Sequence, residues 1–132
     1  MRYLSKAFGA TRLFDDPNAA VKFSLDLILM DRRFGDLAQL LNEGSGVFEV
    51  AGEPGYSLQR RAPVHSGGGD WPEGKVFRAF VEPSGYELDH PEGFYTTEEF
   101  EGYVSMALGA YVSANPTRAY EVAPVQSKLD AK

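Results

Sequence analysis

The sequence contains no cysteine. This absence excludes disulfide bonds, thiolate metal ligands and cysteine nucleophiles, and with them a small secreted scaffold held by disulfides. A long apolar segment is also missing, because the most apolar stretch, residues 21–31, is interrupted by Lys22 and Asp26 and is too short to cross a bilayer. The first residues do not match a signal peptide either. We therefore expect a soluble, cytoplasmic protein with no membrane insertion.

Basic residues are scarce in the second half of the chain, although the net charge of the whole protein is only -6. Between residues 62 and 117 the basic residues are Lys75 and Arg78 alone. The acidic residues of that stretch are Asp70, Glu73, Glu82, Glu87, Asp89, Glu92, Glu98, Glu99 and Glu101. Such a surface repels nucleic acid backbones and attracts basic proteins over long range. We expect a basic protein partner and no direct binding to nucleic acid.

The length of 132 residues, with no internal repeat, fits a single domain. Residues 46–52, 55–61 and 75–83 are rich in aromatic and β-branched side chains and are bounded by glycine or proline, which predicts three strands of an antiparallel meander. In residues 21–31 the apolar side chains fall at every second position, which favours a further strand. The alternative for that stretch is a helix with Asp16 as cap and a proline in its first turn.

Two helices are predicted. The shorter lies within residues 32–46, where leucines recur at helical spacing before a glycine. The longer lies within residues 95–116, where Thr96 and Glu99 have the spacing of a capping box and a proline ends the helix. The sequence thus predicts an α+β fold, a mostly antiparallel β-sheet with two helices packed against it, in one domain over residues 1–122.

The C-terminal end shows little apolar periodicity. Residues 118–122 (RAYEV) are predicted as a last edge strand, and residues 123–132 as a flexible tail. An exposed strand edge also leaves open the pairing of two copies of the chain.

The stretch HSGGGDW, residues 65–71, looks suited to chemistry. An esterase oxyanion loop of the His-Gly-Gly-Gly type requires a G-x-S-x-G nucleophile motif, which the sequence lacks. A phosphate-binding loop requires Lys-Ser/Thr after the glycines, but Asp70 and Trp71 follow here. The stretch is therefore interpreted as a surface loop that orders against a partner, with Trp71 either as an interface anchor or as a cover over the core.

His65 and His90 lie near acidic residues, and an enzyme or metal site using them with Asp70 and Asp89 is the alternative hypothesis. Their spacing matches no metal or catalytic motif. We expect no enzymatic activity, no catalytic residue, no metal and no cofactor.

Tyrosines and carboxylates alternate in residues 84–101. Aromatic rings offer contact area at low entropic cost, and carboxylates can pair with lysine or arginine on a partner. The predicted partner-binding residues are Asp70, Trp71, Tyr86, Glu87, Asp89, Glu92, Tyr95, Glu98, Glu99 and Glu101.

Residues 93–116 (GFYTTEEFEGYVSMALGAYVSANP), an aromatic-rich turn that leads into a capped helix, resemble part of the small acidic immunity proteins of bacterial polymorphic and contact-dependent toxin systems. The resemblance implies a stoichiometric inhibitor that binds a cognate toxin domain, often a basic nuclease, and blocks its active site. A phage-type inhibitor of a defence complex is the other binding-protein hypothesis, since the same acidic surface would serve it.

Overall fold

The computed structural model describes residues 3–9, 15–42, 47–53, 55–61, 71–82 and 88–131. Within them four antiparallel strands form one sheet in the order β1-β2-β3-β4. The strands are β1 Phe48–Gly52, β2 Tyr56–Arg60, β3 Phe77–Val81 and β4 Glu92–Tyr95. The three strands expected from the sequence are confirmed, and so is the meander. The fourth strand was not predicted, because it is short and contains a glycine, which has a low strand propensity.

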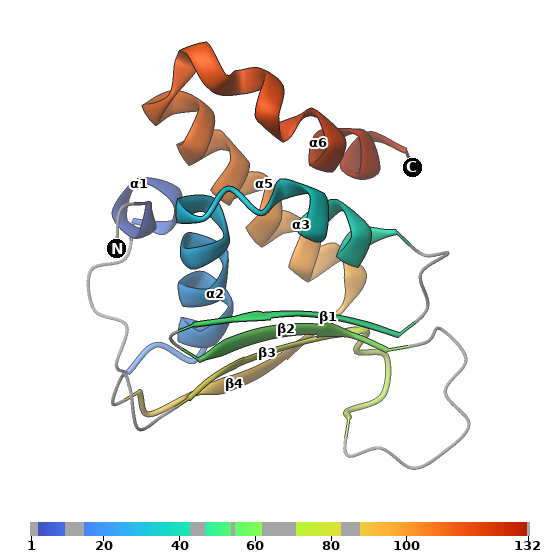
Figure 1. The fold of residues 1–132 in the computed structure, drawn as a ribbon. Helices are drawn as coiled ribbons and strands as arrows, with labels where there is room; N and C mark the ends of the chain where they lie inside the picture. Colours follow the sequence, from blue (N-terminus) through green and yellow to red (C-terminus); the bar gives the residue numbers. More distant parts are fainter. Residues whose placement is uncertain are drawn as a thin grey trace.

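The helices are α1 Leu4–Phe8, α2 Ala19–Met30, α3 Phe34–Leu41, α5 Thr97–Ala114, the 3-10 helix η2 Pro116–Val122, and α6 Ala123–Asp130. All of the helices labelled in Figure 1 lie on the same side of the sheet. The fold is therefore α+β, as the sequence predicts, although more helices pack on the sheet than the two that were expected. Both predicted helices are present, as α3 and α5.

The core lies between the sheet and α2. Because side chains alternate across a strand, Leu58 and Ala79 face the helices and are fully buried. Helix α2 contacts β2, β3 and β4, while α5 closes the end of the sheet at β4. There the rings of Phe77 and Phe100 stack with their centroids 4.2 Å apart. The inner face of the sheet thus packs against α2 and α5.

The predicted strand in residues 21–31 is wrong, because these residues form α2. Val21, Leu25 and Leu29 belong to the alternating set, but they also lie four residues apart, so the same side chains satisfy both periods. All three are buried, and so is Ile28. The sheet covers one side of α2 and α1, α3 and α5 cover others. A helix covered on several sides lacks the polar stripe that would have revealed its period in the sequence.

The N-terminus of α2 is held by Asp16, though not as its cap. The N-cap is Asn18, and its backbone N–H donates to Asp16 Oδ1 at 2.8 Å. The Lys22 ammonium donates to Asp16 Oδ2 at 2.6 Å. Burial raises the pKa of the Asp16 carboxyl, but the hydrogen bonds from Lys22 and Asn18 outweigh burial and leave this pKa below its ordinary value. These contacts hold the backbone of Asn18 at the start of α2.

The C-terminal predictions are also wrong. Residues 118–122 belong to the 3-10 helix η2 rather than to an edge strand, and residues 123–130 form α6 rather than a flexible tail. Helix α6 packs against α3, and its Val125 is fully buried. One face of this C-terminal segment carries apolar side chains at spacings of three and four, at Val122, Val125 and Leu129. Three residues are too few for this period to stand out in the sequence.

Shortening Val125 tests the packing of α6. We expect Val125→Ala to lower the free energy of unfolding by about 1–3 kcal/mol, because it removes buried methyl groups and leaves a cavity. Ser127→Ala, at an exposed position of the same helix, is the matched control and should change stability little. Urea unfolding followed by circular dichroism measures both, and equal stability of the two variants would show that α6 does not pack as described.

Candidate functional site

One face of the sheet carries no helix among the described residues (Figure 1). We call it the outer face. It is formed by the strand residues that alternate with the buried ones: Glu49, Ala51, Ser57, Gln59, Arg78, Phe80, Glu92 and Phe94. Strand register places Glu49, Gln59, Arg78 and Phe94 in one row across it.

A chain of polar contacts crosses the outer face. The Gln59 amide donates to Glu49 at 2.9 Å and accepts from Arg78 Nη1 at 2.7 Å. Arg78 Nε in turn donates to the Glu92 carboxylate on β4. All four strands are therefore joined by side chains as well as by the backbone, and this holds the outer face in one conformation.

Trp71 lies against the outer face. Its ring meets Phe94 edge to face, with centroids 5.4 Å apart, and the Arg61 guanidinium sits over the indole at 5.4 Å. Trp71 is half-buried and takes no part in the buried core cluster of the described residues. It also lines a groove of about 540 Å³ with Val47, Phe48, Glu49, Gln59, Arg60 and Arg61. Trp71 is thus placed beside the outer face, and its role as an interface anchor stays a prediction.

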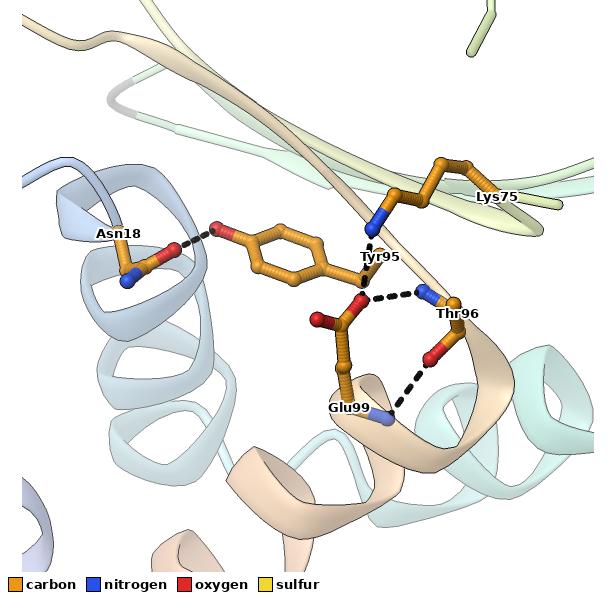
Figure 2. Close-up of polar contacts among 5 residues, drawn as sticks. All are labelled: Asn18, Lys75, Tyr95, Thr96 and Glu99. Atoms are coloured by element: carbon orange, nitrogen blue, oxygen red, sulfur yellow. Dashed lines mark hydrogen bonds and ion pairs between the residues drawn. The ribbon is translucent and has the colours of Figure 1, made fainter. Parts of the chain in front are cut away.

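The acidic first turn of α5 adjoins β4. Thr96 and Glu99 form the predicted capping box, which is confirmed: the Thr96 hydroxyl accepts from the Glu99 backbone N–H at 3.1 Å, and the Glu99 carboxylate accepts from the Thr96 N–H at 2.9 Å. Lys75 donates to the same carboxylate oxygen at 2.9 Å (Figure 2). These hydrogen bonds, first that from Thr96 and then that from Lys75, lower the pKa of Glu99.

Tyr95 joins β4 to α2. Its side chain is 4 % exposed, and its hydroxyl donates to Asn18 Oδ1 at 3.0 Å (Figure 2). The ring passes over Gly93, which faces the same side of β4, and meets Tyr103 edge to face at 5.6 Å. Burial is the main cause that raises the pKa of the Tyr95 hydroxyl well above its ordinary value. The negative charges of Tyr103, Asp16 and Glu99 raise it further.

A hollow of about 380 Å³ opens between β4 and α5, and we call it the β4–α5 hollow. Its lining residues are Asn18, Phe94, Tyr95, Glu98, Glu99, Gly102, Tyr103 and Met106. Phe94 is shared with the outer face, where it packs on Trp71. The hollow and the outer face are therefore two parts of one continuous surface around β4.

The described members of the predicted partner-binding set gather around β4 and the start of α5. Trp71 and Glu92 lie at the outer face, while Tyr95, Glu98 and Glu99 line the hollow. Two further members are placed nearby in the chain: Asp89, exposed before β4, and Glu101, half-buried on α5. Three others lie outside the described residues: Asp70, Tyr86 and Glu87.

This surface is less acidic than the sequence indicates. Lys75 and Arg78, the basic residues of residues 62–117, pair with Glu99 and Glu92. Phe80 and Phe94 were not among the predicted residues. Their outward orientation follows from period two once β3 and β4 are aligned. Nothing in the sequence indicated that Arg61 meets Trp71, because no local pattern relates residues ten positions apart outside one helix or strand.

Of the two histidines of the alternative hypothesis, His90 lies in the part of the chain that the structure describes. His90 is exposed ahead of β4, while His65 and Asp70 lie outside the described residues. Among the residues described, no three His, Cys, Asp or Glu side chains are grouped as metal ligands would be. In the same residues, no helix combines the length and apolar character that a membrane span requires.

Comparisons with known proteins give no match: no protein-family model, curated protein or solved structure is significantly similar to this chain.

A substitution at Gly93 tests the packing of the Tyr95 ring. In Gly93→Ala the added Cβ would meet the Tyr95 hydroxyl and lie 2.9 Å from Cζ of the ring, so we expect a loss of about 1–3 kcal/mol in the free energy of unfolding. Gly109 lies at an exposed position of α5. In Gly109→Ala the added Cβ meets nothing within 4 Å. This control should gain about 0.5–1 kcal/mol from helix propensity. Urea unfolding compares the two, and a stable Gly93→Ala would contradict the packing of Tyr95.

The raised pKa of Tyr95 predicts loss of stability in alkali. The unfolded tyrosine ionises near its ordinary pKa of 10.0, whereas the folded one holds its proton to higher pH. Protons therefore leave the unfolded state first, and stability falls as pH rises above 10 by up to about 1.4 kcal/mol per pH unit for such a group. Tyr95→Phe should show a shallower fall in urea unfolding than the parent, and Tyr120→Phe, at an exposed position, should match the parent. Identical slopes for Tyr95→Phe and the parent would contradict this account.

Proposed function

We propose that this chain is a stoichiometric inhibitor of the immunity type, which binds a cognate basic toxin domain through the outer face of its sheet and the adjoining acidic turn of α5. The observation that carries the proposal is the Trp71–Phe94 pair, half-buried on a sheet face that no described helix covers. Tryptophan and arginine are enriched among residues that dominate binding energy, and here Arg61 stacks on Trp71.

The outer face has the composition of an interface. Aromatic rings alternate with polar groups that are already hydrogen-bonded to one another, from Glu49 through Arg78 to Glu92. A surface held in this way loses little conformational freedom when a partner docks. Covering Trp71 and Phe94 would remove their remaining apolar surface from water, while the polar row would supply the hydrogen bonds of a rim.

Charge supports a basic partner. The chain carries a net charge of -6, and the exposed carboxylates of Asp89 and Glu98 flank β4 on its two ends. A nuclease domain presents a positive cleft to hold nucleic acid, and an acidic protein can occupy that cleft in its place. Glu92 and Glu99 are already paired with Arg78 and Lys75, so Asp89 and Glu98 are the carboxylates with which a cation on the partner would pair first.

Affinity capture from source cells with the tagged full chain tests this function. We expect a basic protein to bind in one-to-one ratio, to associate more slowly as salt is raised, and to lose its toxic activity in the complex. With the purified partner, Trp71→Ala should weaken binding at least about thirtyfold, the effect of losing a hot-spot side chain. Tyr120→Ala, which removes a 74 % exposed ring from η2, is the matched control and should bind as the parent does.

Equal affinities of the Trp71 and Tyr120 variants would refute the role of the outer face. A captured partner whose activity is unchanged in the complex would refute inhibition. A host defence complex in place of a toxin would refute the immunity assignment and leave the binding surface standing. Circular dichroism of both variants checks that they remain folded.

A further inference from the structure

The β4–α5 hollow has the size and walls of a side-chain pocket. Its volume is about 380 Å³, and its walls include Phe94, Tyr95 and Tyr103, with the thioether of Met106 at one side. Tyr95 and Tyr103 meet edge to face, so their rings present surfaces at a steep angle to each other. Aromatic faces of this kind attract a flat cation, and a guanidinium group stacks on them readily because it is planar and weakly hydrated.

The rim of the hollow supplies negative charge from two carboxylates. Glu98 is exposed there. The capping box and Lys75 both bond to Oε1 of Glu99, and Figure 2 shows its other carboxylate oxygen pointing away from these donors, toward α2. Because its conformation is already set by the helix cap, Glu99 needs no reordering to meet a cation.

The tyrosines of the hollow respond to a negative potential. Burial comes first for both hydroxyls. For Tyr103 the charges of Asp16 and Glu99 come next, and for Tyr95 they follow that of Tyr103; in each case the pKa of the hydroxyl is raised. The two rings stand on different elements, β4 and α5, so both sides of the hollow experience the same field.

We propose that the β4–α5 hollow receives one arginine side chain of the protein partner, with the guanidinium against the ring of Tyr103 and beside the carboxylates of Glu98 and Glu99. This inference rests on the proposed function, since it names the chemistry by which the partner is recognised. The hollow meets the outer face at Phe94, so an arginine seated in it lies beside a partner that covers Trp71.

Gly102 gives a means of closing the hollow without harming the fold. It lies on α5, lines the hollow, and an added Cβ there meets nothing within 4 Å. Gly102→Leu therefore fills the hollow and improves helix propensity. Gly109→Leu, the same change on the same helix at another open position outside the hollow, is the matched control.

The first experiment uses N-acetyl-arginine amide as the probe, titrated into the full chain and followed by amide chemical shifts. We expect saturable, millimolar binding with shifts at Glu98, Gly102 and Tyr103. N-acetyl-citrulline amide, which has nearly the same shape without the charge, and N-acetyl-lysine amide, which has the charge without the plane, should each bind at least about tenfold more weakly. Binding should be lost in Gly102→Leu and kept in Gly109→Leu.

The absence of shifts, shifts at other residues, or equal binding of citrulline or lysine amide would each overturn the arginine site, whatever partner is found. The second experiment measures the captured partner with both variants. We expect Gly102→Leu to weaken it at least about tenfold and Gly109→Leu to leave it unchanged. If Gly102→Leu binds the partner normally while Trp71→Ala does not, the arginine site is refuted and the proposed function is still supported. If Trp71→Ala has no effect, the proposed function fails, whereas the probe still reports on the hollow.

Discussion

The packing of α2 across the inner face of the sheet is the interaction on which the rest of the structure depends. Helix α2 contacts three of the four strands and also α1, α3 and α5, and eight of its twelve residues are buried. Because one helix fills the centre of the inner face, the remaining helices take places around it on the same side. The core is then complete on that side alone, and the outer face is left to polar and aromatic side chains.

Strand β4 connects the packed inner face of the sheet to the candidate site on the outer face. Its residues alternate, so that Tyr95 points inward to Asn18 at the start of α2 while Phe94 points outward to Trp71. Gly93 permits the first of these contacts, because any side chain at its position would collide with the Tyr95 ring. A four-residue strand thereby couples the position of α2, the start of α5 and the surface that we propose for a partner.

Ion pairs between carboxylates and basic side chains shape the electrostatics of this surface. Carboxylates that the sequence presents as an acidic group divide into two kinds in the structure. All four of these carboxylates are exposed: Asp89, Glu92, Glu98 and Glu99. Glu92 and Glu99 also set local conformation, through Arg78 on the outer face and through the capping box with Lys75. The paired carboxylates restrict side-chain motion at this surface, while Asp89 and Glu98 give it a net negative character, so the two kinds contribute to binding by different physical routes.

The sequence by itself determined the features that depend on near neighbours in the chain. The capping box at Thr96 and Glu99, the short helix α3 and the first three strands were predictable, because caps, turns and alternation act over a few residues. Only the tertiary structure decided the rest. The apolar residues of α2 satisfy both periods until burial on several sides selects the helix, and Val125 on α6 matters only because α3 covers it. The meeting of Trp71 with Phe94, and the pairing of Lys75 with Glu99, likewise join residues more than twenty positions apart. Such contacts follow from how the strands and helices are arranged in space, which no local pattern specifies.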